Sequence, residues 1–145
     1  MMLIKVILGA LFADTYTYWK HRSLHCGALF VFHKDHHTFL NPSTFAGFAL
    51  HPVEGLATFW PIWLFSIPQL NLWAPLYAGF LIGFGFLNLY LHCGQDVAWL
   101  DNLLAYVWLN TSRWHNLHHE RTVKHFGEVS YFWDLYCGTG GDTRI

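Results

Sequence analysis

The sequence predicts an all-α protein, an integral membrane helical bundle with a histidine-rich cap that faces the cytoplasm. Of its 145 residues, 54% are hydrophobic and only 12% are charged, against about 25% in an ordinary soluble domain. The length fits one domain over residues 1–145. Eight of the eleven histidines fall in three tight clusters, at His21 and His25, at His33, His36 and His37, and at His115, His118 and His119.

The first predicted helix starts at the N-terminus and continues to His25. Its apolar run Met1–Phe12 is too short to cross a bilayer alone, which takes about 20 residues, and it lacks the small-residue cleavage site of a secretory signal. At about 100° per residue, Asp14, Tyr18, His21 and His25 share one narrow stripe of this helix. Two imidazoles one turn apart can chelate a single ion.

The pattern HxxHH occurs twice, in HKDHH and in WHNLHH. We expect both segments to be helical, so that the three imidazoles of each spread over about 100° of the helix circumference. A triplet that wide can serve two metal ions, with one imidazole directed toward each side.

Two membrane spans are expected, at about 43–67 and at about 72–92. The second carries no charge and has the length that a bilayer core requires. The first is interrupted by His51 and Glu54 near its start, which we expect near the headgroups, and by Pro61, which predicts a kink.

Residues 66–71, which include Pro68, predict a tight lumenal or periplasmic turn between the two spans. Such a hairpin returns the chain to the side it left, so His51 and His92 should lie at the same membrane face. His92 ends the second span, and Asn88 and Asp96 lie one turn away from it as candidates to orient its ring.

Basic residues indicate that this face is cytoplasmic, because the hairpin turn carries no Lys or Arg. The protein is therefore expected in the endoplasmic reticulum membrane if eukaryotic, or in the inner membrane if bacterial. The basic residues that flank the histidine clusters are Lys20, Arg22, Lys34, Arg113, Arg121 and Lys124.

The remaining composition excludes several function classes. A formal net charge of −1 and the absence of a Gly-rich phosphate loop argue against a nucleic-acid partner. Three cysteines without CxxC spacing suggest neither a disulfide framework nor a zinc ribbon. A nearly all-imidazole site suits redox iron, with zinc as an alternative metal.

Several motifs together resemble the fatty acid hydroxylase superfamily, specifically its sterol desaturase-like branch. They are HRSLH, HKDHH and WHNLHH, the approach DTYTYWK, the segment HPVEGL, the isolated LHCG and the ending HFGEVSYFWDLYCGT. The resemblance covers nearly the whole chain. Relative to that family the N-terminal membrane hairpin is missing, so the chain is expected to be a shortened version of the domain.

The resemblance implies a membrane oxygenase with two histidine-bound iron ions, which uses O2 to hydroxylate or desaturate a sterol-like or fatty acyl lipid. No haem-binding or flavin-binding pattern is present, so a separate electron donor is expected, a small cytochrome or a ferredoxin with its reductase. No catalytic residue is expected beyond the metal ligands. The implied ligands are His21, His25, His33, His36, His37, His92, His115, His118 and His119.

His51 and His125 are secondary ligand candidates. His125 stands where the family's NYG motif has its Asn, in a segment expected to leave the helix before Gly127. We therefore expect His125 to cap or support its surroundings and not to bind the metal. Asp14, Tyr18 and Asp134 are further candidates to orient imidazoles, although Asp134 could instead only anchor the C-terminal turn.

Two other functions compete with the oxygenase. A non-enzymatic metal-binding membrane protein or transporter would also need many histidines, but a transporter strings its ligands through the membrane interior, whereas these motifs sit at span ends. A catalytically silent scaffold with bound zinc is the second alternative.

Overall fold

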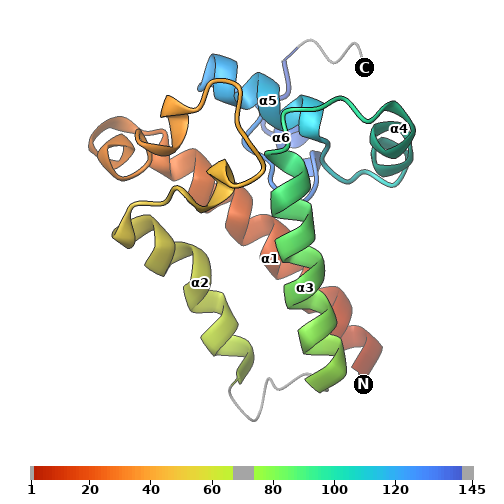
Figure 1. Cartoon of the computed structure of the whole chain (residues 1–145). Coiled ribbons are helices and arrows are strands. Elements are labelled where there is room, and N and C mark those ends of the chain that lie inside the picture. Colours follow the sequence, from red (N-terminus) through yellow and green to blue (C-terminus); the bar gives the residue numbers. More distant parts are fainter. Residues whose placement is uncertain (1, 67–73, 142–145) are drawn as a thin grey trace.

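Helices and turns build the protein in the computed structural model, which describes residues 2–66 and 74–141 (Figure 1). The predicted all-α class is confirmed for these residues. The α-helices are α1 (Met2–Leu24), α2 (Pro52–Ser66), α3 (Ala74–Leu91), α4 (Ala98–Tyr106), α5 (Ser112–Arg121) and α6 (Phe132–Tyr136), and short 3-10 turns cover Gly27–Phe32, His36–Thr38 and Ala46–Phe48.

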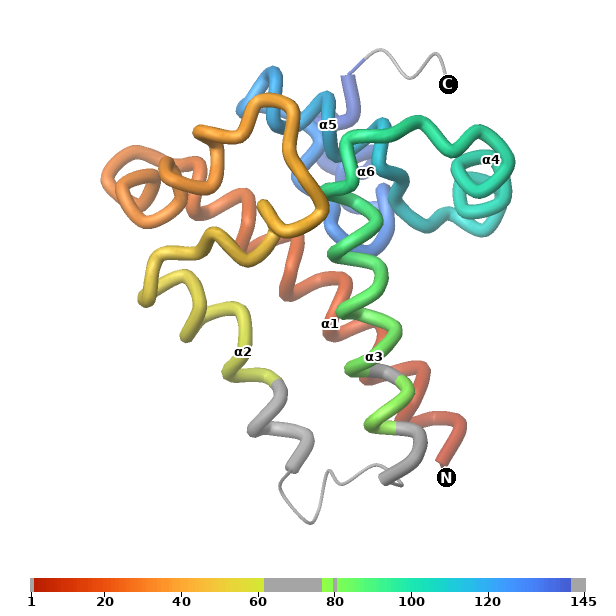
Figure 2. The backbone as a smooth tube through the Cα atoms, in the orientation of Figure 1, coloured from red at the N-terminus to blue at the C-terminus, as the bar shows by residue number. Residues whose placement is uncertain are grey.

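The helices form two regions. The long helices α1, α2 and α3 extend to one side, and the N-terminus lies at their far end (Figure 1). The opposite end consists of α4, α5, α6, the 3-10 turns after α1 and the loops that join them, and we call it the cap, residues 25–51 and 92–141. Helix α3 contacts α5, and α1 contacts α2, so the cap is built on the ends of the long helices (Figure 2).

Helix α1 confirms the long helix predicted from the first stripe of residues. It runs without a break to Leu24, one residue before His25. It is held against α2 by Tyr16, whose hydroxyl donates to the Ala57 carbonyl over 2.5 Å and accepts from the Trp60 indole over 2.6 Å. The register of α1 is therefore fixed where it enters the cap.

The HKDHH segment does not form the predicted α-helix. The chain makes turns from His33 and a single 3-10 turn at His36–Thr38. A helix needs several consecutive hydrogen-bonded turns before it is stable. Because the residue before Pro42 is restricted to extended conformations, the segment from His33 to that point is too short to form a stable helix. The turns instead stack the rings of His33 and His36, whose centroids are 4.9 Å apart.

The two apolar segments are helical over most of their predicted lengths. The segment expected at 43–67 is helical from Pro52, with Pro61 inside the helix, and residues 43–51 form turns. The segment expected at 72–92 is helical as α3. The predicted turn at 66–71 falls almost entirely outside the described residues. Within the described residues, none of the helices combines the length and the apolarity that crossing a membrane takes.

The interior of the cap is polar, which is unusual for a folded core. Histidine, Asn110, Asp134 and Glu54 side chains are almost completely buried there. Large apolar side chains instead cover the outer faces of the long helices, as at Leu3 and Phe86, which are 70% and 68% exposed. The fold thus turns its polar groups inward and its apolar groups outward.

Candidate metal centre

Nine histidines from four separate segments converge in the cap. They come from the end of α1, from the turns after it, from the end of α3 and from α5. Within each of two groups the ligand nitrogens lie within 4.8 Å of one another. The first group is His21, His25, His33, His37 and His118, and the second is His36, His92, His115 and His119.

In the first group, the Nε2 atoms point at one another. His21 Nε2 lies 3.1 Å from His33 Nε2, and His25 Nε2 lies 3.1 Å from His37 Nε2. His118 Nε2 joins them, 3.2 Å from His37 Nε2. Five imidazole edges therefore surround one small volume.

The second group has the same arrangement. His92 Nε2 lies 2.9 Å from His115 Nε2 and 3.3 Å from His36 Nε2. The ring of His119 packs beside His36, with centroids 4.7 Å apart. The two groups adjoin, because the centroids of His37 in the first and His119 in the second are 4.8 Å apart.

Each HxxHH triplet is divided between the two groups. In α5, His115 and His119 are four residues apart and share one face, whereas His118 is rotated toward the first group. The turns of HKDHH direct His36 to the second group, although this segment is not helical. Both triplets thus contribute imidazoles to both groups, as the spacing suggested.

Four imidazoles are held in place by a hydrogen bond that their Nδ1–H donates. His33 Nδ1–H donates to the Glu54 carboxylate over 2.7 Å. The other three donate to backbone carbonyl oxygens, His21 to Phe126 over 2.9 Å, His92 to Asn88 over 2.8 Å and His118 to Lys124 over 2.7 Å. Partners of this kind set the tautomer and the ring orientation of metal-binding histidines.

These tautomers provide a test of whether metal fits the site. When Nδ1 of His21 and of His33 carries the proton, both Nε2 atoms present lone pairs, and these lie 3.1 Å apart with no hydrogen between them. Two such lone pairs repel unless a cation binds both. Ligands about 2.1 Å from one ion lie about 3.0 Å apart in octahedral and about 3.4 Å apart in tetrahedral geometry. The spacings match a shared ion.

Burial keeps several of these imidazoles neutral. Desolvation, with His33 nearby, lowers the pKa of His37 to about 3. Desolvation, with His37 nearby, lowers the pKa of His119 to about 3 as well. The pKa of His118 also falls well below its ordinary value, mainly through burial. Near neutral pH these three rings are therefore in the neutral form that binds metal.

Asp134 organises the C-terminal segment beneath the first group. It is fully buried and accepts four hydrogen bonds, from the backbone N–H groups of Phe126 and Gly127 over 2.9 and 2.8 Å, from the Trp114 indole over 3.2 Å, and from the Thr139 hydroxyl over 2.7 Å. Because the Phe126 carbonyl holds His21, Asp134 acts on that ligand only indirectly.

The other candidates to orient imidazoles have different roles. Asp14 accepts two hydrogen bonds from Ser130 and ties α1 to the C-terminal segment. The Tyr18 hydroxyl lies 2.9 Å from the Thr139 hydroxyl. Asp96 is exposed, and Asn88 holds His92 through its backbone and not through its side chain.

The two secondary ligand candidates lie outside both groups. His51 is half-buried, its Nδ1 accepts the Val53 backbone N–H over 3.2 Å, and its ring packs 5.1 Å from Phe32. His125 is buried beside Trp114, with ring centroids 4.4 Å apart. As predicted, His125 follows the end of α5, where Thr122 adopts a left-handed conformation at φ 55°.

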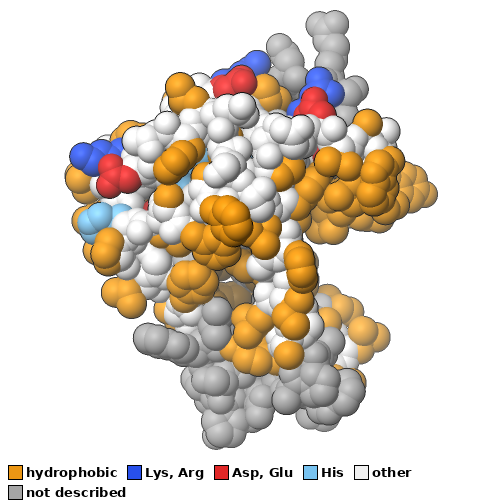
Figure 3. Space-filling view, in the orientation of Figure 1, with side chains coloured by type: hydrophobic (Ala, Val, Ile, Leu, Met, Phe, Trp, Pro, Cys, Tyr) orange, Lys and Arg blue, Asp and Glu red, His pale blue; other side chains and the backbone are white. Residues whose placement is uncertain are grey.

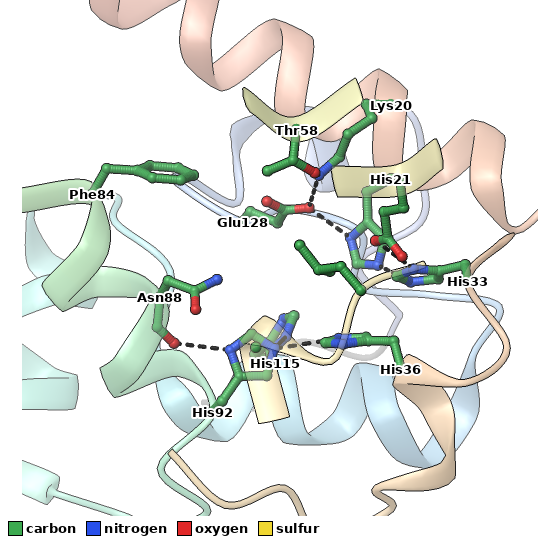
Figure 4. Close-up of a pocket in the computed structure, with 13 residues that line it drawn as sticks. Lys20, His21, His33, His36, Thr58, Phe84, Asn88, His92, His115 and Glu128 are labelled. Carbon is green, nitrogen blue, oxygen red and sulfur yellow. Dashed lines mark hydrogen bonds and ion pairs between the residues drawn. The ribbon is translucent and has the colours of Figure 1, made fainter. Parts of the chain in front are cut away.

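A small cavity of about 30 Å³ borders the two groups on the side of the long helices (Figure 4). His21, His33, His36, His92 and His115 line it. On the other side it is bounded by Leu50, Phe84 and Asn88, and by an ion pair in which Lys20 Nζ lies 3.1 Å from Glu128 Oε1. The imidazoles are thus accessible from between α1, α2 and α3.

Sequence reasoning missed Glu54 and the backbone acceptors. Glu54 was expected near headgroups, whereas it is 2% exposed against His33. Its position three residues after His51, in the HPVEGL segment, gave no sign of this pairing. The carbonyls of Phe126, Asn88 and Lys124 carry no sequence signal, because every residue has one.

We expect Glu54→Gln to weaken metal binding about 10- to 100-fold, the range typical of lost outer hydrogen-bond partners. The amide keeps the size of the carboxylate but removes the negative charge that supports the ring of His33. Competition with a chelator measures the affinity. Glu120→Gln, on the exposed face of α5, is the matched control, and equal affinities in both variants would show that Glu54 does not support the site.

Comparisons with known proteins agree with this geometry. The sequence profile described as fatty acid hydroxylase matches residues 6–139. A probable Delta(7)-sterol 5(6)-desaturase of Neurospora crassa is 29% identical over 91% of this chain and 37% of its own. A Delta(7)-sterol 5(6)-desaturase of Eremothecium gossypii is 31% identical over 94% and 37%. A putative methylsterol monooxygenase of Dictyostelium discoideum is 28% identical over 97% and 52%.

The chain spans between 34% and 52% of the length of these and similar curated relatives. No solved structure matches it.

Proposed function

Because the chain belongs to the fatty acid hydroxylase family, we propose that it is an O2-dependent oxidoreductase that hydroxylates or desaturates a C–H bond of a lipid at a centre of two iron ions. The observation that carries this proposal is the convergence of nine imidazoles, eight of them buried and that of His25 half-buried, into two adjoining groups. The names of the relatives, sterol desaturase and methylsterol monooxygenase, favour a sterol-like substrate.

In this proposal the nine clustered histidines are the metal ligands, five for one ion and four for the other. A bound iron pair would supply the activation of O2 for attack on an unactivated C–H bond. The chain's own contribution is to hold the rings. Glu54 and the carbonyls of Phe126, Asn88 and Lys124 fix the Nδ1 sides of His33, His21, His92 and His118, so that the Nε2 lone pairs of these four rings are directed inward.

The lipid is proposed to reach the centre from the side of the long helices. The cavity beside the imidazoles lies between α1, α2 and α3, and Leu50 and Phe84 give it an apolar wall. The polar cap closes the opposite side, where Asp134 anchors the C-terminal segment. At about 30 Å³ the cavity has room for about one water molecule, so it marks the side of approach of the lipid and is not itself the lipid-binding site.

We propose that the long helices lie in a membrane, with the span predicted at about 43–67 limited to α2 and the span predicted at about 72–92 formed by α3. The apolar outer faces of α1 and α3 support this, because exposed side chains such as Leu8 and Ile82 would otherwise contact water. The exposed basic residues Lys34, Arg113 and Arg121 lie in the cap, which favours a cytoplasmic cap. The same basic surface is where a separate electron donor, a small cytochrome or a ferredoxin, would dock.

The experiment that tests the function combines metal analysis with lipid analysis. We expect the purified protein to bind two iron ions per chain, measured by elemental analysis. Lipid extracts from cells with and without the gene, compared by mass spectrometry, should differ by one oxygen or by two hydrogens in one lipid class. Zinc in place of iron together with unchanged lipids would instead support the silent scaffold.

A further inference from the structure

Helix α4 turns apolar side chains outward, the reverse of the usual arrangement in a water-soluble protein. Its exposed stripe is Trp99, Asn102, Leu103 and Tyr106, which follow the spacing of one helical face. Trp99 is 71% exposed and Tyr106 is 85% exposed. A short helix on a protein in water would turn these side chains inward.

The charged residue of α4 lies on the side that packs against the protein. Asp101, the only charged residue of the helix, accepts a hydrogen bond from the Tyr90 hydroxyl of α3. The Tyr131 hydroxyl donates to the Ala105 carbonyl over 2.6 Å. These bonds fix the rotation of α4, so its apolar stripe stays outward.

The apolar surface continues past the end of the helix. Val107 and Trp108 are 52% and 53% exposed. Trp108 has φ 64°, a left-handed conformation that is unfavourable for a bulky side chain. Its ring stacks on Tyr131, with ring centroids 5.5 Å apart. We call Trp99, Leu103, Tyr106, Val107 and Trp108 the α4 patch.

The α4 patch has a defined orientation in the molecule. Figure 3 shows apolar side chains gathered over α4, on the right of the view, whereas the charged side chains on that side lie above them. Helix α4 begins seven residues after the end of α3, the helix proposed to leave the membrane there. The patch therefore lies a short stretch of chain away from the surface proposed to face lipid.

We propose that α4 lies in the membrane interface, with the α4 patch inserted among the lipid headgroups and upper acyl chains. Tryptophan and tyrosine are the residues that favour this layer, where the ring is in an apolar setting and the polar edge meets water. In this position α4 fixes the depth and tilt of the cap, and so the height of the metal centre above the acyl chains. The inference rests on the proposed membrane location but not on the catalytic activity.

Photo-crosslinking tests this position directly. The probe is p-benzoyl-phenylalanine, an aromatic residue of similar bulk, introduced in place of Trp99 or of Tyr106 in the full chain. Glu120, exposed on α5 in the cap, is the control site. The protein is incorporated into phosphatidylcholine nanodiscs and irradiated, and adducts are identified by mass spectrometry.

We expect phospholipid adducts at positions 99 and 106 at least about tenfold above those at position 120, as burial in the interface requires. Equal adduct yields at all three positions would overturn the inference, as would adducts of positions 99 and 106 with a second copy of the chain. Protein that does not enter nanodiscs at all would overturn the membrane location itself, so the two failures are distinguishable.

Discussion

His92→Ala is expected to remove one of two bound metal ions and to lower lipid oxidation by more than about 100-fold, beyond the range of lost outer partners. His92 directly follows the last residue of α3, and its Nε2 lies against both His115 and His36. Without it the second group keeps three imidazoles from the turns and α5, and loses its link to α3.

Metal content per chain and turnover of the lipid substrate measure this effect. His51→Ala is the matched control, because His51 is a half-buried histidine of the same cap that lies outside both groups. The control should keep two ions and full activity. Retention of both ions by His92→Ala, or loss of one by His51→Ala, would refute the ligand assignment.

Asp134→Ala is expected to lower the free energy of unfolding by about 3 to 5 kcal/mol, since each buried donor left without a partner costs about 1 to 3 kcal/mol. The four donors that Asp134 satisfies are buried or partly buried in the cap. Gly127 leaves no room for the chain to rearrange, because a Cβ there would approach the Ser130 carbonyl oxygen.

Denaturation followed by circular dichroism measures the loss. Asp134→Asn keeps one carbonyl oxygen as an acceptor and should be destabilised less than Asp134→Ala. Asp96→Ala, at an exposed position, should change stability by less than about 0.5 kcal/mol. If Asp134→Ala were as stable as Asp96→Ala, the C-terminal segment would not depend on the buried carboxylate.

The histidine clusters and the helix content were predictable because both depend on residue type and spacing. The stripe of Asp14, Tyr18, His21 and His25 marked α1, and the HxxHH spacing suggested that each triplet could serve two ions. The spacing rule misplaced HKDHH as a helix, because the nearby Pro42 and the packing of the His33 and His36 rings override local periodicity.

The partners behind the imidazoles were not predictable. Glu54 meets His33 across 21 positions of the chain, and nothing local distinguishes it from a surface carboxylate. Backbone acceptors such as the Phe126 carbonyl depend on the path of the C-terminal segment, which the buried Asp134 sets. Contacts of this kind arise only when separate segments are brought together, so they require coordinates.

The facing Nε2 lone pairs of His21 and His33 have a consequence for the protein in the cell. The donor atoms of the empty site repel one another, so the stability of the folded protein depends on bound metal. The free energy of metal binding is then also free energy of folding. Starved of the metal, a cell would accumulate a loosened form that proteolytic quality control removes. Supply of the metal would thereby set how much of the protein persists.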